Sequence, residues 1–291
     1  MTDNEYLRRV LANQDVSDDS DEMKDLRTQR EKVKVLLTTE FGGAPVLLEG
    51  GSKAKGTMIK ESYDLDLPYY FPRDDNSAGD TLKEIYQSVE HALNREYYVE
   101  RKGVAVRLHD MKNTVDFRID VVPGRFVNGF DGDAFLFPAT SEKERLQTNL
   151  DTHIAHVRDS GVVDAIRLMK LWRTRKGIAL KTFALELLTV DVLMGFRGSL
   201  PEQLEAVLTE FRDRANKLSI ADPANSGNDL LGMLYPGVRI RLQIGAQDTL
   251  SAIKAGGWEA VFGKLPEEDS NEALRRISLA SPVSRPWCDH G

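Results

Sequence analysis

Two aspartates, Asp64 and Asp66, stand two positions apart within an otherwise apolar run. Residues two apart on a β-strand project from the same face, so both carboxylates would point one way while Leu65 and Leu67 point into a core. Neighbouring carboxylates repel each other, and a divalent cation such as Mg²⁺, which prefers hard oxygen ligands, relieves that repulsion. The alternative is a solvated acidic strand end.

A glycine-rich turn before the two acids favours the first interpretation. Gly50, Gly51 and Ser52 follow the short apolar run Pro45–Leu48. Glycine lets a backbone approach a phosphate closely, and the Ser52 hydroxyl adds a donor where a helix would begin. The pattern therefore predicts the order strand, turn, short helix, strand over residues 45–70. A phosphate-type turn beside paired acids indicates a metal–nucleotide site.

This arrangement resembles the signature of the DNA polymerase β-like nucleotidyltransferases. The resemblance rests on Gly51-Ser52 followed by Asp64-Leu65-Asp66. In that superfamily the Gly-Ser turn holds the nucleoside triphosphate, and the two acids together with a third bind the catalytic metals. The resemblance therefore implies two Mg²⁺ ions, for which Mn²⁺ could substitute.

A later strand offers the third acid. Residues 114–122 alternate, with apolar side chains on one face and Asp116, Arg118 and Asp120 on the other. The pattern alone leaves both aspartates open, and Asp116 could instead pair with Arg118. The family places its third acid before a short apolar run and a proline, as Asp120 stands before Pro123, so the resemblance favours Asp120 as the third catalytic and metal-binding residue.

Two helical segments narrow the resemblance to one branch. Residues 168–172 (Leu-Met-Lys-Leu-Trp) and 184–188 (Ala-Leu-Glu-Leu-Leu) resemble the bacterial cyclic-oligonucleotide synthases related to cyclic GMP-AMP synthase and oligoadenylate synthase. In those relatives a lysine reaches the triphosphate, a serine touches the donor phosphates and a tyrosine stacks on the base. The matching residues are Lys170, Thr182 and Phe183. Threonine keeps a hydroxyl and phenylalanine an aromatic face, but the phenol oxygen is lost.

Each of these three residues also has a plainer interpretation. Arg167, Lys170 and Arg173 are spaced by three, and such a basic row on a helix is commonly just solvated. Thr182 could be a helix N-cap, and Phe183 a core aromatic.

The surrounding elements predict an α+β fold: a polymerase β-like nucleotidyltransferase core with a mixed sheet, packed on a helical lobe. We expect an acidic N-terminal segment over residues 1–22, the core over 23–139, the helical lobe over 140–265, and an extended or disordered tail over 266–291. The expected helices are 23–40, 81–94, 141–157, 161–176, 180–195, 201–217 and 242–254, and the expected later strands are 97–101, 104–108 and 114–122.

The composition of the chain limits the class of protein, its cellular location and its partners. With 41% hydrophobic and 29% charged residues, the chain of 291 residues has ordinary globular composition. No apolar run approaches the roughly 20 residues that cross a bilayer, and Cys288 is the only cysteine. We therefore expect a cytoplasmic protein without a membrane partner. The formal net charge of −7 argues against long nucleic acid as a partner, although a local basic cleft remains compatible with it.

Two further motifs receive no catalytic role. His153 and His156 are three apart, but no cysteine or clear third ligand accompanies them, so we interpret them as surface histidines. Asp222-Pro223 with Asn228 after it resembles a late segment of the family.

The terminal Gly291 is compatible with conjugation by a ubiquitin-transfer-like partner, as in some bacterial relatives in anti-phage operons. Chance is the favoured explanation, because the chain has 22 glycines. An operon-encoded regulator or conjugating enzyme is accordingly a candidate partner.

The resemblance implies an enzyme that makes a cyclic di- or trinucleotide second messenger from nucleoside triphosphates and releases pyrophosphate, as in bacterial anti-phage (CBASS) signalling. One alternative is a nucleotidyltransferase that extends an RNA end or a linear oligonucleotide. The net negative charge and residues 184–188 weigh against it. A second alternative is an inactive nucleotide sensor, against which the intact set Asp64, Asp66 and Asp120 argues.

Overall fold

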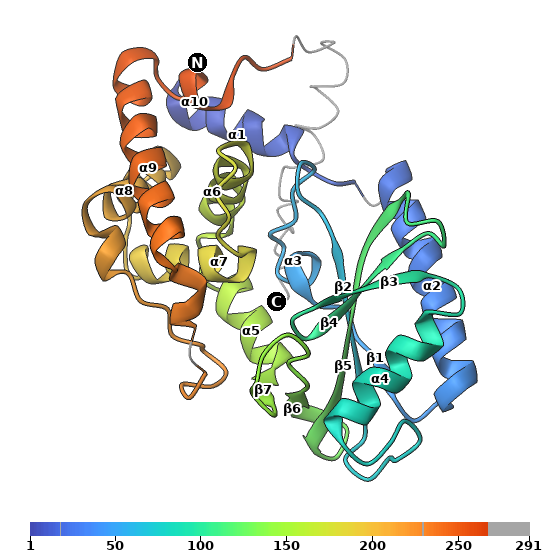
Figure 1. Ribbon diagram of the computed structural model, residues 1–291. Coiled ribbons are helices and arrows are strands. Elements are labelled where there is room, and N and C mark those ends of the chain that lie inside the picture. The colour runs from blue at the N-terminus through green and yellow to red at the C-terminus, as the bar shows by residue number, and fades with distance from the viewer. Residues whose placement is uncertain (18, 229, 267–291) are drawn as a thin grey trace, which may run out of the picture.

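The computed structural model describes residues 1–17, 19–228 and 230–266, so the predicted tail from residue 267 onward, Gly291 included, lies outside the described residues. Two lobes lie side by side, one built around a sheet and the other made of helices (Figure 1). The predicted α+β architecture is confirmed. None of the helices in these ranges is both long and apolar enough to cross a membrane.

The sheet is mixed and follows the order β1-β2-β5-β4-β3, with β6 beside β5 and β7 beside β6. Strands β2 and β5 run parallel, and their register places Asp66 opposite Asp120. The other pairs are antiparallel. The strands are β1 (Val46–Leu47), β2 (Leu65–Phe71), β3 (Tyr98–Lys102), β4 (Ala105–His109), β5 (Asp116–Asn128), β6 (Asp131–Leu136) and β7 (Leu146–Asn149).

The two faces of β2 and β5 have different roles. Leu65 and Ile119 point to a core formed with helices α2 (Asp21–Phe41) and α4 (Leu82–Leu93). A Thr81–Glu84 capping box fixes the start of α4. Because successive side chains alternate across a strand, Asp66 and Asp120 face the other lobe.

The helical lobe has its own core, and the first helix of the chain belongs to it. Leu7 of α1 (Asp3–Asn13) is fully buried in that core, and the Tyr6 hydroxyl donates to the Gly263 carbonyl at 2.5 Å. The remaining elements of this lobe are α5 (Leu150–Arg158), α6 (Val163–Arg175), α7 (Thr182–Val192), α8 (Leu200–Arg214), η1 (Ala215–Lys217), η2 (Leu231–Leu234), α9 (Pro236–Gly256) and α10 (Glu259–Phe262).

The helix expected over 141–157 is wrong in its first half. Residues 146–149 pair antiparallel with β6 and extend the sheet as β7, and the Gln147 and Asn149 side chains both donate to the Asp133 carboxylate, at 2.8 Å each. The Asn149 side chain then accepts from the Thr152 amide and caps α5, which is where the helix begins. Helix α9 also begins earlier than expected, at Pro236.

Candidate active site

The Gly-Ser turn lies directly against the acids. The Gly50 amide donates to the Asp66 carbonyl at 3.0 Å, and Gly51 has φ +61° at the start of the short helix α3 (Gly51–Ala54). A Cβ on Gly51 would lie 1.6 Å from Asp66 Oδ2, so only glycine fits there. The Ser52 hydroxyl is buried and meets no partner in the part of the chain that the structure describes. It is therefore a donor open to a bound ligand.

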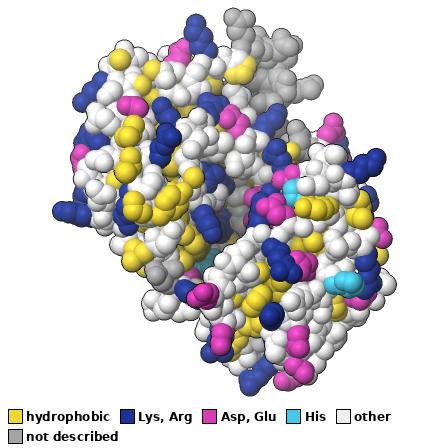
Figure 2. Space-filling model, in the orientation of Figure 1, with side chains coloured by type: hydrophobic (Ala, Val, Ile, Leu, Met, Phe, Trp, Pro, Cys, Tyr) yellow, Lys and Arg dark blue, Asp and Glu magenta, His cyan; other side chains and the backbone are white. Residues whose placement is uncertain are grey.

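The three predicted acids line one cavity of about 560 Å³ between the lobes. Figure 2 shows this hollow, with acidic and basic side chains gathered along it. Burial raises the pKa of Asp66 to about 7, and the charges of Asp64 and Asp120 add to the shift. Burial, followed by the charge of Asp120, also raises the pKa of Asp64. Desolvation and mutual repulsion thus act on the same carboxylates.

Arg107 is the cation nearest to these acids. Its guanidinium donates to both oxygens of Asp120, with Nη2 2.6 Å from Oδ2, and its side chain is 11% exposed. Nη1 donates to Asp116 at 3.1 Å, and Nη2 to Asp64 at 3.5 Å. We call Asp64, Asp66, Asp116, Asp120 and Arg107 the acidic cluster.

The sequence pattern pointed to Arg118 as the partner of Asp116, and the ion pair is made by Arg107 instead. Only the Arg118 backbone amide donates to Asp116, at 2.7 Å. Arg118 has φ +56°, and its guanidinium lies 4.4 Å from the ring centroid of Tyr63. Arg107 faces Asp120 directly across the β4–β5 pair, and alternation along β4 would have indicated it.

The donor set fits a divalent cation in its chemistry. Three carboxylates on one cavity wall are the hard ligands that Mg²⁺ or Mn²⁺ prefers, and their repulsion is what a cation relieves. Within residues 1–17, 19–228 and 230–266, however, no group of three or more His, Cys, Asp or Glu converges closely enough to hold a metal. Asp120 directs both its oxygens to Arg107. Asp64 and Asp66 fit as they stand, and Asp120 fits after its pair with Arg107 opens.

The helical lobe places cations and a hydroxyl across the cavity from the acids. Arg173, Lys181 and Thr182 line that wall. Arg173 Nη1 donates to Thr182 Oγ1 at 2.8 Å, which fixes the hydroxyl beside the guanidinium. The N-cap of α7 is Lys181, so the alternative that Thr182 caps this helix is wrong.

Lys170 lies behind the cavity wall. It is 1% exposed, its Nζ donates to the Thr57 carbonyl at 2.7 Å, and burial lowers its pKa to about 8. Glu186 lies 3.8 Å from Lys170 Nζ and accepts from Lys55 Nζ at 2.8 Å and Thr57 Oγ1 at 2.6 Å. We call Lys55, Thr57, Lys170 and Glu186 the Glu186 cluster. The predicted contact between Lys170 and nucleotide stays a prediction.

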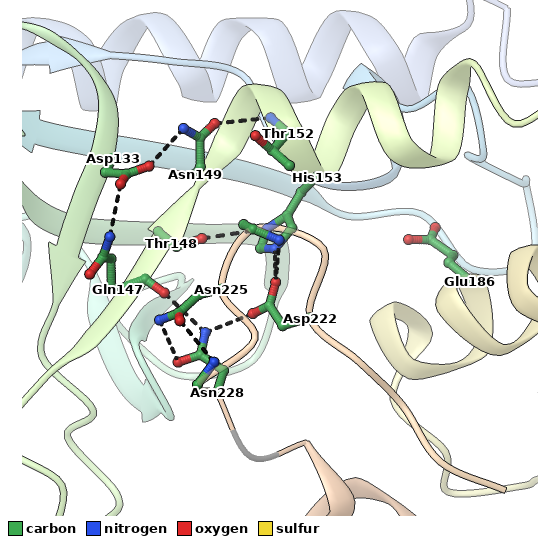
Figure 3. Close-up of polar contacts among 12 residues, drawn as sticks. Asp133, Gln147, Thr148, Asn149, Thr152, His153, Glu186, Asp222, Asn225 and Asn228 are labelled. Carbon is green, nitrogen blue, oxygen red and sulfur yellow. Dashed lines mark hydrogen bonds and ion pairs between the residues drawn. The ribbon is translucent and has the colours of Figure 1, made fainter.

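An aromatic wall completes the cavity. Phe183 lines it, with Lys55 Nζ 5.1 Å from the ring centroid and the His153 ring centroid at 4.9 Å. The interpretation of His153 as a surface histidine is wrong. The loop of residues 218–228 places the Asp222 carboxylate 2.6 Å from His153 Nε2, and 14% of the His153 side chain is exposed (Figure 3).

A larger groove of about 780 Å³ runs beside α2 on the sheet lobe. Val35, Leu36 and Tyr97 supply its apolar walls. The turn, the acids and the cations all meet in the smaller cavity between the lobes, so we place the active site there.

No protein-family profile and no curated protein matches the chain. Solved structures do match it. CdnC from E. coli MS115-1, solved with ATP, has a TM-score of 0.67 at 20% identity, covering 90% of this chain and 98% of CdnC. The same protein was solved as a CdnC:HORMA-deltaN complex, with a TM-score of 0.64 at 21% identity over 89% of this chain and 96% of CdnC.

Two other solved proteins share the fold. The CD-NTase CdnG from Bradyrhizobium diazoefficiens, solved with GTP, has a TM-score of 0.68 at 12% identity, covering 95% of this chain and 98% of CdnG. The Cid1 poly(U) polymerase, bound to MgATP, has a TM-score of 0.62 at 13% identity over 90% of this chain and 98% of Cid1. The predicted resemblance to bacterial cyclic-oligonucleotide synthases is thus confirmed at the level of the fold.

Proposed function

We propose that the chain is a nucleotidyltransferase that joins nucleoside triphosphates into a cyclic di- or trinucleotide and releases pyrophosphate. One observation carries the proposal: a single cavity between the lobes collects the Gly51-Ser52 turn, the acids Asp64, Asp66 and Asp120, and the Thr182-Phe183 pair. These groups come from separate parts of the chain, and a nucleoside triphosphate needs all three kinds of contact.

Different residues of the cavity bind different parts of the substrate. The backbone at Gly51 and the hydroxyls of Ser52 and Thr182 hold the triphosphate, and Phe183 packs against the base. A ribose hydroxyl of a second nucleotide loses its proton and attacks the α-phosphorus; the α–β phosphate bond breaks and pyrophosphate leaves. Each attack releases one proton and one pyrophosphate; a second attack of the same kind closes a dinucleotide ring, and a third closes a trinucleotide ring. Catalysis by these residues is positioning and charge neutralisation.

The acids give the cavity its affinity for divalent cations. Asp64, Asp66 and Asp120 would hold Mg²⁺, or Mn²⁺ in its place. When bound, such ions supply activation of the attacking hydroxyl and stabilisation of the leaving pyrophosphate. Asp66 and Asp120 lie opposite each other on the adjacent parallel strands β2 and β5, which keeps their spacing constant, and Asp64 stands one residue before β2.

A second candidate function is addition of nucleotides to an RNA end or to a linear oligonucleotide. The similarity of fold to the Cid1 poly(U) polymerase favours it. The formal net charge of −7 favours short nucleotide substrates instead.

The cellular role is also proposed. We place the enzyme in the cytoplasm, in anti-phage signalling, where a diffusible cyclic nucleotide would be the messenger. The CdnC:HORMA-deltaN complex of a protein with this fold supports a regulatory protein as a partner. A conjugating enzyme acting at Gly291 concerns a residue outside the described ranges.

Product analysis tests the function. The protein is incubated with the four α-³²P nucleoside triphosphates and Mg²⁺, the products are treated with phosphatase, and they are resolved by chromatography. We expect a small product that carries label from the α-phosphate and runs at the same position with and without phosphatase, because a ring has no terminal phosphate whereas a linear product loses its terminal phosphates and shifts; this product should be absent with Asp66→Asn. Extension of an added RNA oligonucleotide, without such a product, would establish the second candidate. If no nucleotide is transferred under any condition, the inactive nucleotide sensor is the interpretation that remains.

A further inference from the structure

The active-site cavity presents two kinds of surface. The acids on one wall, with Arg173 and Lys181 on the other, are charged, whereas Phe183 packs against His153 and adds aromatic faces. A nucleotide divides in the same way, into a polyanion and a flat base that stacks on aromatic faces. The inference below rests on the proposed function, since it concerns where the base of such a nucleotide packs.

His153 is held by both of its ring nitrogens. Nε2 lies 2.6 Å from Asp222 Oδ1, and Nδ1 lies 3.4 Å from Thr148 Oγ1 (Figure 3). Burial opposes the charge of Asp222, but hydrogen bonds from His153 and Asn228 outweigh it and lower the pKa of Asp222. With both nitrogens engaged inside the protein, the ring carbons are what His153 presents to its surroundings.

The carboxylate that holds His153 is itself tied to the sheet lobe. Asn228 Nδ2 donates to Asp222 Oδ2 at 2.7 Å and to the Gln147 carbonyl at 3.0 Å. The Gln147 side chain donates to Asp133 Oδ2 at 2.8 Å. Figure 3 shows these contacts as one connected series from β6 to α5. The imidazole is therefore fixed relative to both walls of the cavity.

Phe183 has no polar atom that could fix its ring, so neighbouring groups set the ring angle. The imidazole lies 4.9 Å from it, centroid to centroid, at an interplanar angle of 59°, and Lys55 Nζ lies 5.1 Å from its centroid. We propose that His153, held by Asp222, is a positioning residue that fixes the Phe183 ring as the surface on which the nucleobase packs, and so strengthens the binding of the base.

Two substitutions separate the imidazole ring from its hydrogen bond. His153→Gln keeps an amide N–H near the position of Nε2 and loses the ring. His153→Phe keeps a ring and loses the bond to Asp222. Binding is measured by calorimetry in one Mg²⁺ buffer, with the α,β-methylene analogues of ATP and GTP and with inorganic tripolyphosphate. The methylene bridge prevents turnover, so binding is read without activity.

We expect His153→Gln to weaken binding of at least one nucleotide analogue by about fivefold to tenfold, in the range of lost base–aromatic contact. Tripolyphosphate binding should stay within about twofold, because it has no base. His153→Phe should recover only part of the loss, because it restores a ring but not the bond to Asp222 that holds the ring in place. A merely structural role would weaken both ligands alike.

Three results would overturn the inference. They are equal weakening of nucleotide and tripolyphosphate, nucleotide binding by His153→Gln that matches the unmodified protein, and nucleotide binding by the unmodified protein that is no tighter than tripolyphosphate. An unmodified protein that binds neither ligand would overturn the proposed function as well. The thermal midpoint of each variant shows that it is folded.

Discussion

Two clusters of charged side chains flank the cavity. In the Glu186 cluster the cations outnumber the acid, whereas in the acidic cluster the acids outnumber the cation. In the Glu186 cluster one carboxylate, 1% exposed, has two lysines beside it and a threonine hydroxyl donating to it. Burial acts to raise the pKa of Glu186, but Lys55 and Lys170 outweigh burial and lower it. Every group in this cluster has a partner of opposite charge or a hydrogen bond.

The acidic cluster has an excess of acids, with four carboxylates and one guanidinium, and Arg107 contacts three of the four, Asp64, Asp116 and Asp120. Arg107 satisfies Asp120 but leaves the pKa of Asp66 raised to about 7, by burial first and then by Asp64 and Asp120. A buried carboxylate held by lysines and a hydroxyl is typical of structural contacts between elements, whereas several carboxylates with raised pKa values in one cavity are typical of functional sites. We infer that the Glu186 cluster joins the two lobes and that the acidic cluster binds a cationic ligand.

The largest effect should come from the acidic cluster. Asp66→Asn removes a charge from the cavity and should lower the transfer rate by about 1,000-fold or more, because a metal ligand is lost. Asp64→Asn and Asp120→Asn should act alike. The rate of pyrophosphate release measures the effect, and Asp131→Asn, an exposed acid on the same sheet, serves as the control. A folded Asp66→Asn protein that transfers nucleotide at the normal rate would contradict the assignment.

The Glu186 cluster should respond in stability. Glu186→Gln keeps the shape of the side chain but leaves Lys55 and Lys170 without their counter-charge. Removing one partner from a buried ionic group costs about 3 kcal/mol or more. Urea unfolding of metal-free protein measures the free energy of unfolding. Asp191→Asn, an exposed acid at the end of the same helix, should change it little. If Glu186→Gln lowers the free energy of unfolding by less than about 1 kcal/mol, the Glu186 cluster has no structural role.

Sequence patterns predicted the elements that carry the acids, because local spacing determines them. Period-two alternation and a Gly-Ser turn are visible without tertiary contacts, and Asp64, Asp66 and Asp120 do meet in one cavity. Seven of the eight predicted site residues line it, Lys170 being the exception.

The partners of those residues could not be predicted in the same way. Lys55 and Glu186 are 131 positions apart, and their pairing follows from how the lobes pack. His153 and Asp222 are 69 apart, and their pairing follows from packing within the helical lobe. Residues 146–149 were predicted as helix because the backbone pairing with β6 that makes them a strand, with the side-chain bonds to Asp133 beside it, is a tertiary contact. Choice of side-chain partner is a tertiary property, and single-sequence periodicity carries no record of it.

The difference between the clusters should also appear in the pH dependence of stability. The folded-state pKa of Asp66 is about 7, against an ordinary value of 3.8. Between these values the folded protein binds more protons than the unfolded chain, so stability falls as pH rises toward 7 and levels off above it. In metal-free protein, Asp66→Asn should remove the part of this fall that comes from Asp66 and leave the part that comes from Asp64, whose pKa burial also raises. The variant should be more stable than the unmodified protein at pH 8, by about 2 kcal/mol or more. If the free energies of unfolding of Asp66→Asn and of the unmodified protein differ by the same amount at every pH from 5 to 8, the raised pKa of Asp66 is contradicted.

The smallest effect should come from Asp116, the carboxylate of the acidic cluster that does not line the active-site cavity. Its side chain is 42% exposed and shares Arg107 at 3.1 Å, whereas the Asp120 side chain is 13% exposed and binds the guanidinium through both oxygens. Burial acts to raise the pKa of Asp116, but the Arg118 amide and Arg107 lower it, so it is charged at neutral pH without help from a metal. Asp116→Asn should therefore reduce the transfer rate by less than about threefold, as is usual for exposed ion pairs. A loss as large as that of Asp120→Asn, measured side by side with Mn²⁺ binding, would transfer the third ligand position to Asp116.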